Sequence, residues 1–256
     1  MITIKSNREI ELMREAGHIV ALAHQAVADA IKPGISTQEL DKIAYDVIVS
    51  HGATPSFLNY NGYPATICAS INEVVVHGIP NKRTILKDGD IISVDIGACF
   101  KGYHGDCAKT HLVGHVSEEV KQLVEVTKAS LLAGLKFARP GNRLSDISHA
   151  IEEYVSKYGY GVIKDYTGHG IGHALHEDPA IPNYGPSGRG VILKKGMTLA
   201  IEPMIALGTW RVRILKDGWT SVTIDNLPCS HHEHTIVITD DGYEILTKIK
   251  GEEIDV

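Results

Sequence analysis

Hydrophobic residues recur at helical spacing in four segments of the chain, and each segment is bounded by residues typical of helix ends. Ser6 and Ser36 are each followed three residues later by a glutamate, which is the capping-box pattern of a helix N-terminus. Pro-Gly pairs and single glycines mark the C-terminal ends. The four predicted helices run from Ser6 to Pro33-Gly34, from Ser36 to Gly52, from about Ser117 to Pro140-Gly141, and from about Ser145 to Gly159.

Runs of β-branched and apolar residues follow each pair of predicted helices and indicate strands. These runs cover residues 91–98, 108–113, 197–207 and 235–239. Paired helices followed by strands, with no linker or low-complexity tract between them, predict a single α+β domain over residues 1–256.

The order of these elements repeats within the chain. The offset from Pro33-Gly34 to Pro140-Gly141 is 140 − 33 = 107, and the same offset aligns the similar segments 85–89 and 192–196. We therefore predict an internal duplication with pseudo-two-fold symmetry, whose halves cover about 1–115 and 116–256.

The duplication also aligns acidic residues. Asp95 corresponds to Glu202 at the same offset, whereas the offset between the next acids, Asp106 and Glu233, is 233 − 106 = 127. The second half therefore contains about 20 additional residues, which fit the segment 207–225 with both tryptophans. Each half is predicted to place two carboxylates close to the pseudo-axis.

These four acids need a partner if they are buried. Asp95 and Glu202 each end a run that is otherwise typical of a buried strand, and a buried carboxylate must be paired, protonated or bound to metal. No lysine or arginine lies in their immediate strand context. Converging carboxylates repel one another unless divalent cations lie between them. A metal site is the preferred hypothesis, and a structural ion-pair cluster is the alternative.

Histidines near these acids are not equivalent. His169 lies among three glycines that leave its ring uncrowded, and the same glycines argue against a helix that would make His173 a second ligand. In the run 231–234, side chains alternate between the two faces of a strand. If Glu233 faces inward, His232 and His234 face the other side, where they would contact solvent or support the ligands.

Four carboxylates and one imidazole suit two hard or borderline divalent ions. Two such ions indicate hydrolysis of an ester, phosphate or amide.

Composition narrows the class of protein. The net charge is −6 without charged blocks, which argues against a protein built mainly to bind nucleic acid. Four cysteines without a C-x-x-C pair are typical of buried thiols in a reducing compartment. The segment 1–17 is too charged for a signal peptide, and the apolar stretch 19–31 is too short to span a bilayer. We therefore expect a cytoplasmic protein without a membrane partner.

Several motifs together resemble those of the type I methionine aminopeptidases. The matching segments are 72–80 (NEVVVHGIP), Asp95, 104–106 (HGD), 167–172 (TGHGIG), 176–177 (HE), 201–204 (IEPM) and 232–235 (HEHT), and the likeness covers essentially the whole chain. The resemblance implies the pita-bread fold and removal of the initiator methionine when the second residue is small. It also implies that the partners are nascent polypeptide N-termini, near the ribosome.

The resemblance further implies a role for each matching residue. Asp95 would bind one metal ion, His169 and Glu202 the other, and Asp106 and Glu233 would bridge the two. Glu202 would also accept a proton from the attacking water. His77 would contact the peptide nitrogen, and His176 the scissile carbonyl and the oxyanion formed from it. The ions would be Fe²⁺, Mn²⁺, Co²⁺ or Zn²⁺.

A methionine pocket is expected from the same resemblance, and soft or aromatic walls suit a thioether. Its residues would be Phe57, Tyr60, Tyr63, Cys68 and Trp219. Many family members carry histidine where this chain has Asn61 and a bulky aromatic residue where it has Leu175, so side-chain preference is less defined than reaction type.

Two other interpretations remain. A proline-specific peptidase of the same fold shares the ligand pattern but usually carries a large N-terminal domain, whereas the first helix is predicted here near residue 7. A non-catalytic binding protein of this fold typically lacks some ligands, whereas all five positions are filled here. The sequence also starts without a zinc-finger extension, as in the short bacterial form, so no dedicated segment for ribosome docking is expected.

Overall fold

The computed structural model describes residues 2–252 and contains the four expected helices. They are α1 (Asn7–Ala30), α2 (Thr37–Ser50), α3 (Glu118–Leu135) and α4 (Leu144–Ser156). The Ser6 and Ser36 side chains accept from the backbone N–H groups of Glu9 and Glu39, and each glutamate accepts from the backbone N–H of its serine. Both predicted capping boxes are therefore confirmed, each with a stabilisation of about 1 kcal/mol.

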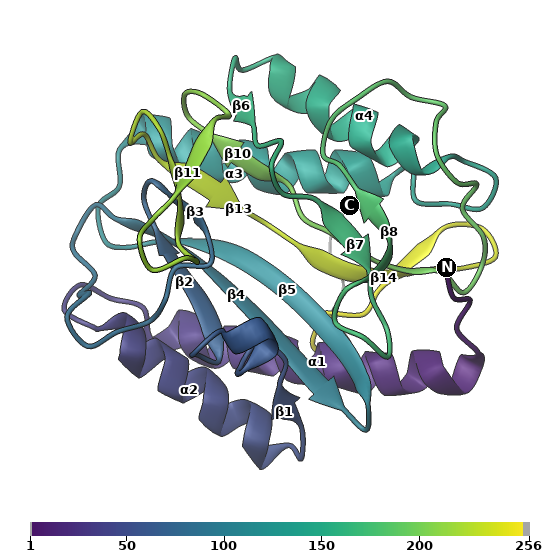
Figure 1. The fold of residues 1–256 in the computed structure, drawn as a ribbon, viewed down its shortest axis with the longest axis horizontal. Helices are drawn as coiled ribbons and strands as arrows, with labels where there is room; N and C mark the ends of the chain where they lie inside the picture. The colour runs from purple at the N-terminus through teal and green to yellow at the C-terminus, as the bar shows by residue number, and fades with distance from the viewer. Residues whose placement is uncertain (1, 253–256) are drawn as a thin grey trace.

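The strands form four antiparallel sheets between the two helix pairs (Figure 1). The first sheet contains β1 (Thr54–Pro55), β2 (Ile67–Ile71), β4 (Ile91–Phe100) and β5 (Tyr103–Leu112). The largest sheet has the order β15 (Tyr243–Ile245), β14 (His234–Ile238), β9 (Thr198–Ile201), β7 (Gly168–Gly170) and β8 (Glu177–Ile181). One small sheet has the order β13 (Cys229–His231), β10 (Met204–Ala206) and β6 (Gly161–Val162). The other has the order β11 (Val212–Ile214), β12 (Ser221–Thr223) and β3 (Val74–Val76).

Two strand predictions were wrong at the acidic residues. The predicted strand 197–207 is two strands of different sheets, β9 and β10, because Glu202 and Pro203 interrupt it, and Pro203 has no N–H for a ladder. Asp95 does not end its strand but lies in the middle of β4, opposite Ala108 of β5. Both acids therefore lie inside the protein rather than at a sheet edge.

Each helix pair covers its own group of strands. In Figure 1, α1 and α2 lie below the β4–β5 hairpin, α3 lies behind β10 and β13, and α4 lies above them. One apolar core joins α1 and α2 to the first sheet, with Val20, Leu40 and Ile96 fully buried. A second core joins the start of α4 and the end of α3 to the largest sheet.

The cysteines belong largely to these interiors. All four thiols are free, and Cys68, Cys107 and Cys229 are buried as predicted. Cys99 differs, because it is only half-buried near the tip of the β4–β5 hairpin.

Equivalent positions of the two halves make equivalent backbone contacts. Ser36 bridges Ile85 in the first half, and Arg143 bridges Ile192 in the second. Gly34 donates to the Leu86 carbonyl, and Gly141 donates to the corresponding carbonyl of Leu193. Both glycines have positive φ, where a side chain would be strained. These pairs support the proposal of an internal duplication.

The additional segment of the second half forms a hairpin that joins the first half. Strands β11 and β12 pair with each other, and β12 also pairs with β3. The loop between β11 and β12 contains Trp219. The inserted residues thus bring a tryptophan from the second half toward strands of the first.

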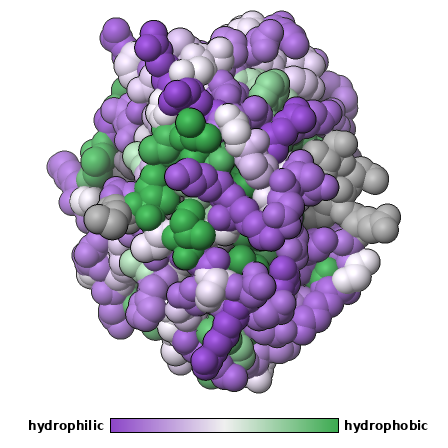
Figure 2. Space-filling model, turned by 90° about the vertical axis from the view of Figure 1, so that its right-hand side faces the viewer, coloured by the Kyte–Doolittle hydropathy of each residue, from purple (hydrophilic) through white to green (hydrophobic). Residues whose placement is uncertain are grey.

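The described surface is largely polar on the face at the right of Figure 1. Figure 2 shows this face covered mainly by hydrophilic residues, with one compact group of hydrophobic side chains. Across residues 2–252, no helix combines the length and the apolar character needed to cross a bilayer.

We predict that His24 makes the folded protein less stable as the pH falls. This residue is buried on α1, with its Nε2 2.8 Å from the Cys107 carbonyl oxygen. Burial, and next the charge of Lys109, lowers the pKa of His24 well below its ordinary value. Below about pH 6.5 the unfolded chain therefore binds a proton that the folded chain excludes, so acid destabilises the fold. In His24→Leu, the slope of unfolding free energy against pH between 4.5 and 6 should decrease by about 1.4 kcal/mol per pH unit. Urea unfolding at several pH values measures this slope, and equal slopes in parent and variant would contradict the prediction.

Candidate active site

The floor of the site begins with two aspartates on one β-hairpin. Asp95 lies on β4 and pairs with Ala108 of β5. Asp106 lies on β5, two residues before Ala108. Residues related in this way lie on the same face of a sheet, and the two carboxyl groups are hydrogen-bonded to each other. The Asp106 side chain is almost fully buried.

The second half supplies three further groups from different segments. His169 lies on β7, Glu202 directly follows β9, and Glu233 lies between β13 and β14. The Glu233 N–H donates to the Ala108 carbonyl at 2.8 Å, which fixes the second half against β5. The five side chains that the sequence predicted as ligands all line one cavity: Asp95, Asp106, His169, Glu202 and Glu233.

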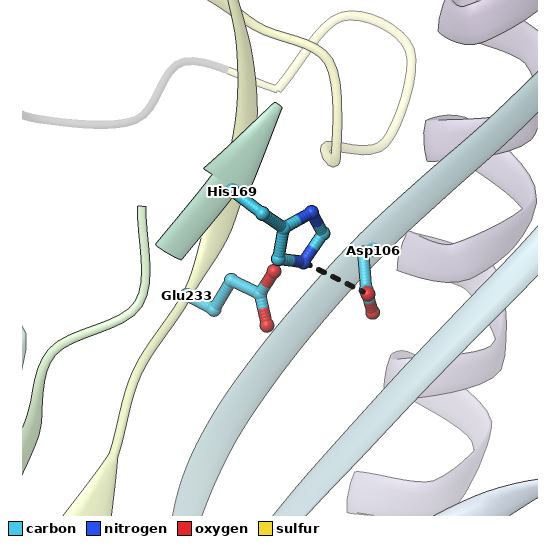
Figure 3. A group of neighbouring side chains, drawn as sticks. All are labelled: Asp106, His169 and Glu233. Carbon is cyan, nitrogen blue, oxygen red and sulfur yellow. Dashed lines mark ion pairs between the residues drawn. The ribbon is translucent and has the colours of Figure 1, made fainter. Parts of the chain in front are cut away.

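His169 is oriented by its own strand. Its Nδ1 lies 2.8 Å from the Gly170 carbonyl oxygen, which makes Nδ1 the donor and leaves the Nε2 lone pair free for other groups. Nε2 is 3.5 Å from Glu202 Oε1 and 4.0 Å from Asp106 Oδ2. Figure 3 shows this ring between Asp106 and Glu233, each from a different segment. The ring is thus preset as an electron-pair donor.

Ionisation of all four carboxyl groups at the same time is strongly disfavoured. Burial raises the pKa of Asp95 to about 7, and burial with the nearby charge of Glu233 raises that of Asp106 well above its ordinary value. The pKa values of Glu202 and Glu233 are raised for the same reasons, burial first and then neighbouring carboxylates. Within residues 2–252, no lysine or arginine forms an ion pair with any of these four groups. The predicted ion-pair cluster is therefore the weaker alternative.

The donor set fits divalent cations. Two groups have ligand atoms within 4.8 Å of one another: Asp106, His169 and Glu233, and Glu202, His231 and Glu233. In the part of the chain that the structure describes, one oxygen of each of three acids has no hydrogen-bond partner: Asp95 Oδ1, Asp106 Oδ1 and Glu233 Oε1. Carboxylate oxygens with imidazole nitrogens suit Mn, Fe, Co and Zn ions.

His231 was not predicted as a site residue. It is 2% exposed, lines the cavity and faces two of the acids. Strand alternation contained the signal, because residues 231 and 233 share a face when Glu233 points inward.

The neighbouring histidines are arranged differently. His232 is buried, which excludes solvent contact and leaves support of the ligands as its predicted role, and His234 is half-buried with Nδ1 2.8 Å from Thr247 Oγ1. His173 is exposed and lies against the Tyr103 ring, with centroids 5.4 Å apart. Neither of the two groups of candidate ligand atoms found among residues 2–252 contains one of these three histidines.

Above the acids lies a cavity of about 310 Å³, a size that suits a small side chain and the backbone beside it. Its wall includes all five residues predicted for a methionine pocket: Phe57, Tyr60, Tyr63, Cys68 and Trp219. Asn61 and Leu175 also line it. The Tyr63 and Trp219 rings meet edge to face, with centroids 5.2 Å apart. The inserted hairpin therefore completes an aromatic wall.

His77 and His176 lie on this wall as well. The His176 Nδ1 is 2.8 Å from the Tyr60 hydroxyl oxygen, and its ring centroid is 4.2 Å from that of His169. The His77 ring packs edge-on against Tyr166. Burial lowers the pKa of both histidines, that of His77 to about 4, so both rings are neutral near pH 7. Neutral imidazoles can each donate one N–H to a ligand in the cavity.

The loop that carries His176 is anchored by the N-terminal segment. The buried Lys5 ammonium lies 2.5 Å from Glu177 Oε2, and the Thr3 hydroxyl donates to the same oxygen at 2.9 Å. The other Glu177 oxygen accepts from the Ala174 N–H at 3.1 Å. Because breaking a buried ion pair is costly, these contacts hold the loop in one position.

The chain is similar to known proteins over almost its whole length. A family model described as metallopeptidase family M24 matches residues 11–240. Methionine aminopeptidase 1 of Bacillus subtilis is 56% identical over 249 residues, which cover 97% of this chain and 100% of that protein. The crystal structure of a methionine aminopeptidase from Thermotoga maritima has a TM-score of 0.96 at 50% identity and covers 97% of this chain and 100% of its own. A prolidase from Pyrococcus furiosus has a TM-score of 0.76 at 26% identity, covering 96% of this chain and 65% of its own.

We predict that cation binding releases protons from this site. Burial raises the pKa of Asp95 to about 7, so below pH 7 a cation must displace a proton that the carboxyl group holds. Apparent Co²⁺ affinity should therefore rise with pH between 5.5 and 7.5, by about tenfold per pH unit for each proton displaced. Calorimetry at pH 6 in buffers of different ionisation enthalpy counts the protons. Asp95→Asn should release fewer, and binding without proton release in the parent protein would disprove this account.

Proposed function

The chain belongs to metallopeptidase family M24 and, within it, to the methionine aminopeptidases, and we propose that the side chains described above carry out its reaction. It has the pita-bread fold and is a metal-dependent hydrolase that removes the N-terminal methionine of new polypeptides when the second residue is small. The observation that carries the residue assignment is the convergence of five candidate ligands from both halves at the floor of one cavity.

We assign two divalent ions to this floor, of Fe²⁺, Mn²⁺, Co²⁺ or Zn²⁺. Asp95 would hold one ion, His169 and Glu202 would hold the other, and Asp106 and Glu233 would contribute to both. Bound there, the ions supply a Lewis acid for the scissile carbonyl and lower the pKa of the attacking water. The grouping of Asp106, His169 and Glu233 within 4.8 Å supports this assignment.

The protein's own groups orient the substrate and move the proton. Glu202, which borders the cavity beside His169, accepts the proton of the attacking water. We assign the Tyr60 hydroxyl as the donor to His176 Nδ1, which makes Nε2–H the donor toward the scissile carbonyl and the developing oxyanion. His77 contacts the nitrogen of the peptide bond.

The aromatic wall recognises the methionine side chain. A thioether gains favourable contacts with aromatic ring edges and with the Cys68 sulfur, which lies beside Tyr63 in the cavity. Leu175 leaves more space than an aromatic residue would at that position. We therefore assign methionine selectivity mainly to Tyr63, Cys68 and Trp219.

We further propose a cytoplasmic location, with new polypeptide N-termini near the ribosome as substrates. The substrate itself supports this location, because the initiator methionine becomes accessible as the chain emerges during synthesis.

Peptides that differ only in the first two residues test the function. With Co²⁺ or Mn²⁺ added under anaerobic conditions, Met-Ala-Ser should be cleaved at least about 100-fold faster than Met-Ile-Ser, a difference of about 2.7 kcal/mol in barrier. The expectation follows from the chain's membership of the methionine aminopeptidases, which act when the second residue is small. Liquid chromatography of the released methionine gives the rates. Preferential cleavage of an Xaa-Pro peptide would identify a prolidase instead, and no cleavage despite bound metal would identify a binding protein.

Alanine substitutions of His176 and His173 compare a proposed site residue with a neighbouring residue that has no proposed role. His176→Ala removes an oxyanion donor and should lower kcat by roughly 10²–10³ while metal content stays at the parent level. His173→Ala changes an exposed ring on the same loop and serves as the matched control, with kcat and metal content unchanged. Steady-state kinetics and metal analysis of both purified variants decide the assignment. It would be wrong if His176→Ala retained parental kcat or lost its metal.

A further inference from the structure

His231 lies against the acids of the second half without a role in the reaction described above. Its Nε2 is 3.7 Å from Glu202 Oε2 and 3.9 Å from Glu233 Oε2. The side chain is 2% exposed and borders the cavity. Among residues 2–252, nothing forms a hydrogen bond with this nitrogen. A buried polar atom without a partner is costly and points to a missing ligand.

The distances describe a ligand sphere better than a hydrogen bond. Both are longer than a normal N–H···O contact, whose upper limit is about 3.2 Å. With metal–ligand bonds of about 2.0–2.2 Å, two atoms on one ion lie about 3–4.4 Å apart. Glu202 shows the same spacing toward His169, whose Nε2 lies 3.5 Å from its other oxygen. The Glu202 carboxylate thus lies between two imidazole nitrogens, one facing each oxygen.

The backbone aims this imidazole at the acids. The His231 N–H donates to Thr110 Oγ1 at 3.0 Å and Ser93 Oγ at 3.2 Å, and the His231 carbonyl accepts from Thr110 Oγ1 at 2.9 Å. On its other side, β13 pairs His231 with Met204, two residues after Glu202. Contacts from both halves therefore fix the residue before any ion binds.

We propose that His231 is a further metal ligand, which binds through Nε2 the ion that Glu202 holds. The inference rests on the proposed metal-dependent function and extends its ligand set from five residues to six. An ion with two imidazole ligands is more strongly nitrogen-ligated than its neighbour among the aspartates. Since imidazole suits Fe, Co, Ni and Zn more than Mn, this position favours those ions over Mn²⁺.

The substitution His231→Gln tests the proposal, because glutamine keeps much of the volume and polarity but lacks the imidazole nitrogen. Metal-free parent and variant are titrated with Co²⁺ and with Mn²⁺ by calorimetry, and the visible spectrum of bound Co²⁺ is recorded. In the variant, Co²⁺ affinity at one site should fall at least about tenfold, with a changed Co²⁺ spectrum. Mn²⁺ affinity should fall less.

The matched control is His232→Gln, which changes the adjacent histidine, also buried, on the side away from the acids. It should leave the Co²⁺ affinity and spectrum at parental values.

A second measurement uses the parent protein, so its result does not depend on whether a variant folds. With ¹⁵N-labelled histidines, Zn²⁺ should shift the ring nitrogens of two histidines into the range of metal ligation, whereas His169 alone would give one.

The outcomes distinguish failure of the His231 assignment from failure of the metal-dependent function on which it rests. Unchanged Co²⁺ affinity and spectrum in His231→Gln, or a single ligated histidine in the parent protein, would overturn the proposal, even if activity fell. Failure of the parent protein to bind Co²⁺ at all, with no cleavage of Met-Ala-Ser, would overturn the metal-dependent function and this ligand with it.

Discussion

Repulsion among four buried carboxyl groups is the constraint on which the rest of the structure depends. Asp95, Asp106, Glu202 and Glu233 are brought together without a lysine or arginine paired to them among residues 2–252. Their pKa values are raised first by burial and, for Asp106, Glu202 and Glu233, also by the neighbouring carboxylates. Packed helices on both sides and strands at the centre hold the groups in place. A binding ion offsets part of this repulsion, so the fold is arranged for tight metal binding.

Local signals in the sequence predicted the four helices and the strands nearest the acids. Both serine capping boxes involve contacts over three residues, and the structure confirms them. The constant offset between the halves aligned Asp95 with Glu202 because duplicated segments keep their spacing, and both residues line the same cavity. Family motifs then supplied the reaction and the remaining residues of the site, whose individual roles are still predictions.

The features that could not be predicted depend on contacts between distant segments. The ion pair of Lys5 with Glu177 joins the N-terminal segment to a loop of the second half, and no periodic pattern describes it. Hydrophobic character alone could not show that the apolar run 197–207 divides between two sheets at Pro203. For His231, by contrast, strand alternation held a usable signal, and it belongs to a group of candidate ligand atoms among the described residues whereas His232 does not.

The hairpin of β11 and β12 has a consequence for the direction of a bound peptide. The floor of the site takes two acids from each of two similar halves, and the second half adds His169. Trp219 comes from a segment that has no counterpart in the first half, so the wall above the floor has no two-fold symmetry. The insertion thus adds to the cavity an aromatic ring that the first half does not repeat. A peptide would therefore meet different side chains in its two possible directions.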